Sequence, residues 1–296
     1  MSLYLVAGQG ALTDAVGVGT HLATTRPRRY PSDTCEQEWQ LIAVHVAAGG
    51  QRGRPVRYPR RDIVDAIRYL DHSCCVWRAL PADFPPWRTV YHYFRSWTRD
   101  GTLTRLHDSL REQLRRIDGR TAAPSAAIVD SQSVRGAETV ARRHRGHDAA
   151  KRINGRKRHI AVDTSGLLLV VLVTAAGLQD RDAARLLLTG LHTCFPTVTK
   201  VWADGGYAGR LVDWAASTLR LAVDIVRKLA GQTTFQPLPR RWVVERTFAW
   251  INRCRRTVRD YERRPEHHAA MVQWAMVTVM TRRLARRHPT RSCVQP

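Results

Sequence analysis

The pattern of apolar and polar positions divides the chain into a helical first part and a mixed second part. Between residues 30 and 120, apolar side chains recur every three to four positions in short stretches, as at Ile63, Ile67 and Leu70. This spacing is typical of a buried helix face. Basic or Pro-rich turns separate the stretches, among them GGQRGRPVRYPRR and the segment from Pro81 to Pro86. We therefore predict a small all-helical domain over residues 30–120.

From residue 124 onward, the chain shows the short apolar runs of β-strands. AAIVDSQSV, RKRHIAVD and LLLVVLVTA predict three consecutive antiparallel strands, and the turn Thr164-Ser165-Gly166 joins the last two. TKVWAD and AVDIV predict two more strands that alternate with helices, and two helices complete the pattern. The order β-β-β-α-β-α-β-α-α indicates an α/β, ribonuclease-H-like core with a mixed sheet over residues 124–287.

The two ends of the chain lack such patterns. Residues 1–29 are rich in Gly, Ala and Thr, and we predict a loose N-terminal extension there and a tail over residues 288–296. The first residues show no positive region and no clean cleavage site of a signal peptide. The longest apolar run, from Leu167 to Gly177, is about half as long as a membrane span requires. We therefore expect a cytoplasmic protein that does not enter a membrane.

Positive charge is the unusual feature of the composition. The chain has 48 Lys and Arg residues against 25 Asp and Glu, which gives a net charge of +23. Nucleic acid is the first partner to consider, because basic clusters bind phosphates and release counterions. A generally basic proteome is the alternative, but the excess here is clustered. We expect DNA contacts from Arg135, Arg156, Lys157 and Arg158 in one cluster, from Arg52 and Arg54 in a Gly-rich loop, and from Arg88.

The cluster between Arg135 and Arg158 follows the first predicted strand directly, so we expect it to flank a site at the end of that strand. A solvated surface loop is the alternative interpretation. In WRTVYHYFRSW the aromatic side chains are expected to pack in the core, which leaves Arg88 and Arg95 available to phosphates. The cysteine and histidine spacings do not match a zinc site.

Three acidic residues occupy positions that the predicted fold would bring to one edge of the sheet. Asp130 ends the first strand, Asp204 ends the fourth, and Glu245 lies on the helix after the fifth. Cleavage of a phosphodiester requires an activated nucleophile and a spread of transition-state charge. Two hard cations about 4 Å apart supply both, and Mg²⁺ binds through a few carboxylates.

Each acid alone has a simpler interpretation, so the inference depends on all three together. A strand-end aspartate is more often a turn or cap residue, and Arg241 with Glu245 fits an ordinary i,i+4 pair on a helix. The pair Gly205-Gly206 after Asp204 favours a site, because glycines allow a tight turn and close approach of a phosphate backbone.

The motifs that contain these acids resemble those of a known family. IVDSQSV, GRKRHIAVD, WADGGY and RRWVVERTFAW are similar to the catalytic motifs of insertion-sequence transposases of the IS-four/IS-five superfamily. YPSD, RGRP and DFPPWRTVYHYF resemble the N-terminal helical domain of that family. The similarity covers about residues 30–286, which predicts a start codon near Tyr30.

The resemblance implies a catalytic DDE triad of Asp130, Asp204 and Glu245, which would also bind the metal. The implied metal is Mg²⁺ or Mn²⁺, expected as two ions. The implied activity is strand cleavage and strand transfer at the terminal inverted repeats of a bacterial insertion sequence. The implied partners are double-stranded element ends and target DNA, bound at the nucleoid by a homodimer because two DNA ends must be paired.

The chain departs from the family's signature around the glutamate, Tyr-x2-Arg-x3-Glu-x6-Lys. Arg241 and Glu245 fit, whereas Leu238 and Asn252 replace the tyrosine and lysine, with Arg253 as the expected substitute cation. These departures leave open a catalytically inactive, sequence-specific DNA-binding protein derived from a transposase. A nuclease or resolvase that hydrolyses DNA without joining it is the other alternative, because one fold can host several activities.

Overall fold

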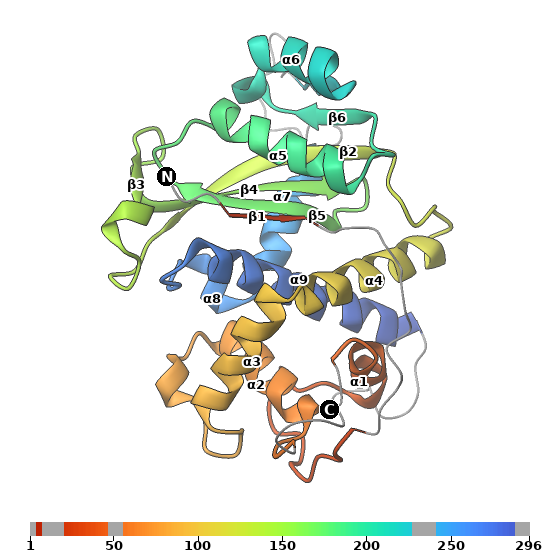
Figure 1. Ribbon diagram of the computed structural model, residues 1–296, viewed down its shortest axis with the longest axis vertical. Helices are drawn as coiled ribbons and strands as arrows, with labels where there is room; N and C mark the ends of the chain where they lie inside the picture. The colour runs from red at the N-terminus through yellow and green to blue at the C-terminus, as the bar shows by residue number, and fades with distance from the viewer. Residues whose placement is uncertain (1–3, 8–20, 47–55, 227–240, 288–296) are drawn as a thin grey trace.

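A mixed β-sheet organises the computed structural model, which describes residues 4–7, 21–46, 56–226 and 241–287 (Figure 1). The strands are β1 (Tyr4–Ala7), β2 (Ala126–Arg135), β3 (Gly146–Asp148), β4 (Ile153–Asp163), β5 (Leu168–Ala175), β6 (Lys200–Ala203) and β7 (Ala222–Ile225). Their order is β1-β5-β4-β2-β6-β7, and β3 pairs with β4. β2, β4 and β5 are antiparallel neighbours, whereas β6 runs parallel to β2 and β7 runs parallel to β6. The predicted half-sheet of antiparallel strands, continued by parallel strands, is confirmed.

Helices cover both faces of this sheet. They are α5 (Asp180–Cys194) and α6 (Arg210–Leu219) on one face, and α7 (Arg241–Ile251), α8 (Arg255–Val258) and α9 (Pro265–Arg287) on the other. A short 3-10 turn, η3 (Gly205–Tyr207), follows β6, and another, η2 (Arg142–His144), follows β2.

Side chains alternate between the two faces along β2 and β6, and this alternation places the candidate site. Ile128 belongs to the apolar core shared with α7 and α9, whereas Val129 belongs to the core beneath α5. On β6, Trp202 lies in the first core and Val201 in the second. Even-numbered side chains of both strands therefore point to the face that α7 covers.

The N-terminal part is helical, as predicted. It contains α1 (Glu36–Ala43), α2 (Arg60–Ser73), the 3-10 turn η1 (Trp77–Ala79), α3 (Trp87–Arg99) and α4 (Thr102–Ile117). The stripe of Ile63, Ile67 and Leu70 on α2 is fully buried. Helix α9 packs against α4 on one side and β5 on the other, so one apolar core runs from the helical part to the sheet. No described helix is long and apolar enough to cross a membrane.

The segment that we predicted as a loose extension, residues 1–29, contacts the rest of the protein where it is described. Tyr4–Ala7 forms β1, which pairs antiparallel with β5. Arg26 binds the helical part, because its Nη2 lies 2.7 Å from Asp33 Oδ1 and 3.1 Å from Asp65 Oδ2. A four-residue edge strand has too few positions to show a period of two, which explains why the sequence pattern missed it.

Candidate active site

Asp130 and Asp204 lie side by side on neighbouring parallel strands. The ladder between β2 and β6 pairs Ile128 with Trp202. Continuing this register by two residues places Asp130 opposite Asp204, on strands about 4.8 Å apart. Both residues are even-numbered, so both side chains lie on the face that α7 covers. The two strand-end aspartates that the sequence analysis singled out are thus brought together.

The turn after Asp204 has the predicted form. Asp204 caps η3, and its Oδ1 accepts a hydrogen bond of 2.8 Å from the backbone N–H of Gly206. This bond occupies Oδ1, while Oδ2 lies on the side of α7, 3.9 Å from Arg241. The glycine pair therefore fixes the carboxylate at the point where β6 ends.

Glu245 reaches the same place from α7. Arg241 Nη2 lies 3.7 Å from Glu245 Oε1 and 3.9 Å from Asp204 Oδ2. The i,i+4 pair on the helix is therefore present, but the same guanidinium also links Glu245 to the strand-end aspartate. Among the described residues, no three acidic, histidine or cysteine side chains stand close enough to hold an ion together. Arg241 occupies the position of counter-ion between the acids.

The electrostatics of Asp130 reflect its half-buried position on β2. Burial, with a smaller contribution from the neighbouring charge of Asp204, raises the pKa of Asp130 to about 6 against the opposing effects of the Ser131 N–H, Arg241 and Lys151. Lys151 was not singled out from the sequence, where it is one of many basic residues in its stretch. The structure distinguishes it by its proximity to an acidic group.

The chemistry of the donor set fits a divalent cation such as Mg²⁺ or Mn²⁺, although Arg241 now stands between Asp204 and Glu245 and the three carboxylates are not spaced to share an ion. Carboxylate oxygens are the ligands that both hard cations prefer. The charge of Asp204 contributes to the raised pKa of Asp130, after burial, and a bound cation would offset this repulsion. Asp130, Asp204 and Glu245 are therefore the residues that would hold the metal.

Arg158 connects the strand of Asp130 to the helix of Glu245. This fully buried guanidinium on β4 donates from Nε to Gln132 Oε1 at 3.0 Å and from Nη2 to Asn252 Oδ1 at 2.6 Å. Gln132 lies two residues beyond Asp130 on the same face, and Asn252 directly follows α7. The predicted DNA contact of Arg158 is wrong, because a guanidinium with no exposed surface cannot reach a phosphate.

The same correction applies to Arg156 and Lys157. Arg156 is fully buried, with its Nη1 2.7 Å from Asp260 Oδ2. Lys157 Nζ lies 3.1 Å from Asp180 Oδ1 and donates to the Leu178 carbonyl at 2.9 Å. β4 lies in the interior of the sheet with both faces covered, so its basic side chains are paired internally.

The remaining predicted DNA contacts have free surface where the structure describes them. Arg88, Arg135 and Arg253 are exposed, and Arg241 is partly exposed beside the acids. Arg52, Arg54 and Leu238 lie outside the described residues. The basic side chains that remain available to DNA are therefore fewer than the composition suggests.

A polar group behind the acids also escaped the sequence analysis. On the opposite face of β2, Ser131 Oγ donates to Asp180 Oδ1 at 2.8 Å. Tyr207 is buried nearby, and its burial, with the charges of Asp130 and Asp180, raises its pKa well above the usual value. Tyr207 therefore keeps its proton at neutral pH.

Comparison with known protein families agrees with this geometry. The family described as transposase DDE domain matches residues 121–280, which contain all three acids. The family described as putative transposase of IS4/5 family matches residues 35–107, in the helical part. A comparison with curated proteins gave no match. The sheet order, the helical N-terminal part and the two family matches together show that the chain belongs to the DDE-domain transposases of the IS4/IS5 type, with a ribonuclease-H-like core.

Proposed function

We propose that this transposase binds the terminal inverted repeats of an insertion sequence, cleaves DNA there and joins the ends to target DNA. The observation that carries the proposal is the shared register of Asp130 and Asp204 on the face covered by the helix of Glu245. We further propose that the protein works as a homodimer on DNA at the bacterial nucleoid, because two ends must be joined in one event.

Asp130, Asp204 and Glu245 would hold Mg²⁺ or Mn²⁺, in our proposal as two ions. When bound, such ions supply a nucleophile activated at neutral pH and stabilise charge on the transferring phosphate. The raised pKa of Asp130, about 6, still leaves this carboxylate mostly ionised at neutral pH. Arg241 is placed to pair with a phosphate once the acids no longer require it as a counter-ion.

Surface cations beside the acids would position the DNA backbone. Arg253 is exposed just beyond α7, and Lys151 is exposed in the turn before β4. Both can approach phosphates on either side of the scissile bond, and neither is paired in a buried network. Their contribution is expected to be affinity and orientation rather than chemistry.

Strand transfer in vitro with matching inverted-repeat ends tests the proposal. Asp130→Asn, Asp204→Asn and Glu245→Gln should each lower strand transfer by about 10³-fold or more. Each variant should still bind the ends, because the substitutions leave the basic surface intact. Asp213→Asn, an exposed acid on α6, is the matched control and should keep full activity.

The outcomes also separate the alternatives. Normal strand transfer by Glu245→Gln would refute the assignment of the triad. Specific end binding without cleavage in either Mg²⁺ or Mn²⁺ would identify an inactive DNA-binding derivative. Hydrolysed ends without joined products would identify a nuclease.

A further inference from the structure

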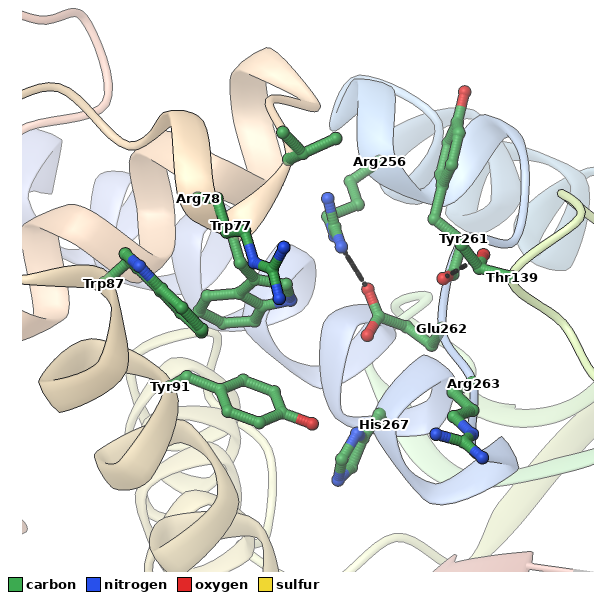
Figure 2. A pocket seen from close by; sticks show the side chains of 11 residues that line it. Trp77, Arg78, Trp87, Tyr91, Thr139, Arg256, Tyr261, Glu262, Arg263 and His267 are labelled. Carbon is green, nitrogen blue, oxygen red and sulfur yellow. Dashed lines mark hydrogen bonds and ion pairs between the residues drawn. The ribbon is translucent and has the colours of Figure 1, made fainter.

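A cavity with aromatic walls lies between the helical part and the segment that leads into α9. Its volume is about 530 Å³. Trp77, Trp87 and Tyr91 line one side, and Tyr261 lies across the space from them (Figure 2). The volume is in the range of small-molecule sites. The walls thus offer flat π-surfaces to a planar group.

Only some of the aromatic side chains that line the cavity pack against the apolar core. Trp77 and Tyr91 contact one another edge to face, with ring centroids 4.9 Å apart, and pack against the main apolar core. Trp87 is half-buried at the start of α3 and does not join that core. Arg78 lies 5.7 Å from the Trp87 ring centroid, so a cation already stands beside this surface.

A buried ion pair forms the polar end of the cavity. Arg256 Nε donates to Glu262 Oε1 at 2.7 Å, and both side chains are 5% exposed. Figure 2 shows the other carboxylate oxygen of Glu262 directed away from Arg256, toward the cavity. His267 closes this end, and burial lowers its pKa to about 4, so that it is neutral at pH 7. The cavity therefore presents a fixed acceptor between apolar walls.

A basic hollow adjoins the cavity and shares Tyr91 and Arg263 with it. Its volume is about 310 Å³, and Arg95, Arg143 and Arg264 also line it. These arginine side chains are exposed; no acid is among the described residues that line the hollow, and Arg264 Nη1 lies 3.5 Å from Glu266 Oε1 beside it. A phosphate is the ligand that such a set of guanidinium groups fits best.

We propose that the cavity binds one unstacked nucleobase of the DNA, while the arginines of the adjoining hollow hold the flanking phosphates. The inference rests on the proposed function, because it takes DNA as the ligand. Base stacking on aromatic side chains is a general mode of binding unpaired nucleic acid. The acceptor of Glu262 favours a base with an exocyclic amino group, such as cytosine, over thymine, which has none.

The cavity is separate from the metal-binding acids. Arg256, at the polar end of the cavity, lies eleven residues beyond Glu245, and the break between α7 and α8 separates the two.

Binding of short single strands tests the pocket without knowledge of the repeat sequence. The full-length protein is titrated with oligodeoxycytidine of about ten nucleotides and with an abasic oligomer of the same length at one salt concentration. The wild type should bind the base-bearing strand about 5- to 150-fold more tightly. Trp87→Ala should lose most of this ratio, whereas Trp87→Phe should keep most of it.

Trp214→Ala is the matched control. Trp214 lies on α6 on the opposite face of the sheet, is half-buried, and has Arg185 5.4 Å from its ring centroid. Trp214 is therefore a half-buried tryptophan beside an arginine, like Trp87, but it lies outside the cavity. Its substitution should leave the ratio of the two affinities unchanged. Oligothymidine should bind the wild type more weakly than oligodeoxycytidine.

Equal affinity of the wild type for oligodeoxycytidine and for the abasic strand would overturn the proposed pocket. The same ratio of these two affinities in the wild type and in Trp87→Ala would also overturn it. Strand transfer measured on the same preparations keeps the two proposals apart. A wild type that joins ends but shows no base preference refutes the pocket alone. A wild type that binds neither strand and joins no ends refutes the proposed function as well.

Discussion

Asn252 offers a direct test of how the active-site helix is held. Its Oδ1 accepts a hydrogen bond of 2.6 Å from Nη2 of Arg158, a fully buried cation. Burial lowers the pKa of Arg158 to about 9, and Asp260 and Asp71 oppose this shift. Among the described residues, no carboxylate forms an ion pair with Arg158, so neutral acceptors stabilise its charge. The family pattern has lysine at position 252, which would place a second cation here.

The size of the effect follows from these contacts. A hydrogen bond to a charged group contributes about 1.5–3 kcal/mol, so Asn252→Ala should lower the free energy of unfolding by about 2 kcal/mol. Asn252→Lys removes the same acceptor and adds repulsion, which reaches about 4 kcal/mol at close range and is reduced if the lysine turns to solvent. Asn252→Asp keeps the acceptor and adds an opposite charge. The expected order of stability at pH 7 is therefore Asp, Asn, Ala and Lys, from highest to lowest.

Thermal unfolding followed by circular dichroism measures this series. The alanine variant should melt about 4–8 °C below the wild type, and the lysine variant lower still. The aspartate variant is the control, because it has the same shape as asparagine and should melt at or above the wild-type temperature. A lysine variant as stable as the wild type would show that Asn252 does not serve Arg158. An aspartate variant less stable than alanine would contradict the electrostatic argument.

Three further substitutions test separate features. Burial raises the pKa of Asp71 to about 7, so the native state loses stability as the pH rises from about 4 to 7. The free energy of unfolding of Asp71→Asn should therefore exceed that of the wild type at pH 8, by up to about 4 kcal/mol, and equal it at pH 4. An equal difference at both pH values would contradict this assignment. Asp260→Ala leaves the buried Arg156 without its carboxylate partner and should lower the free energy of unfolding in urea by about 3–5 kcal/mol; a loss below about 1 kcal/mol would contradict this assignment. Arg253→Ala should leave the melting temperature unchanged and reduce the slope of log affinity for DNA against log salt concentration by about one phosphate contact. An unchanged slope would show that Arg253 does not contact a phosphate.

The sequence predicted the sheet and the acids for a physical reason. A strand whose two faces pack into two different cores has either alternating apolar residues or a continuous apolar run in its sequence. β2, β4 and β5 show these patterns. Once the strand order is known, the ends of parallel neighbours must meet. The pairing of Asp130 with Asp204 therefore required no knowledge of distant contacts.

The fate of the basic residues could not be predicted in the same way. Arg156 and Arg158 lie in a run that looks like a surface cluster, but their partners Asp260 and Asn252 are about a hundred positions away. Local sequence shows the cation and not its partner. A net charge of +23 consequently overstates the charge that DNA can reach.

The cavity escaped prediction because its walls come from two separate segments. Trp87 and Phe94 belong to one helix and were expected to share one role in the core. Phe94 is buried, whereas Trp87 lines the cavity with Tyr261. Helical periodicity identifies the face on which an aromatic side chain lies, but not whether that face is covered.

A single segment, residues 241–267, carries Glu245 near one end and the cavity residues near the other. Its contacts with two buried arginines of the sheet include Asn252 to Arg158, the Thr257 carbonyl to Arg158 at 2.9 Å, and Asp260 to Arg156. Since both arginines belong to β4, the neighbour of the strand that carries Asp130, the sheet itself sets the spacing between acids and cavity. DNA that contacts both would be held at a fixed length rather than across a hinge. Loosening an anchor should therefore change stability and cleavage together, whereas a change in the cavity wall should alter base preference alone.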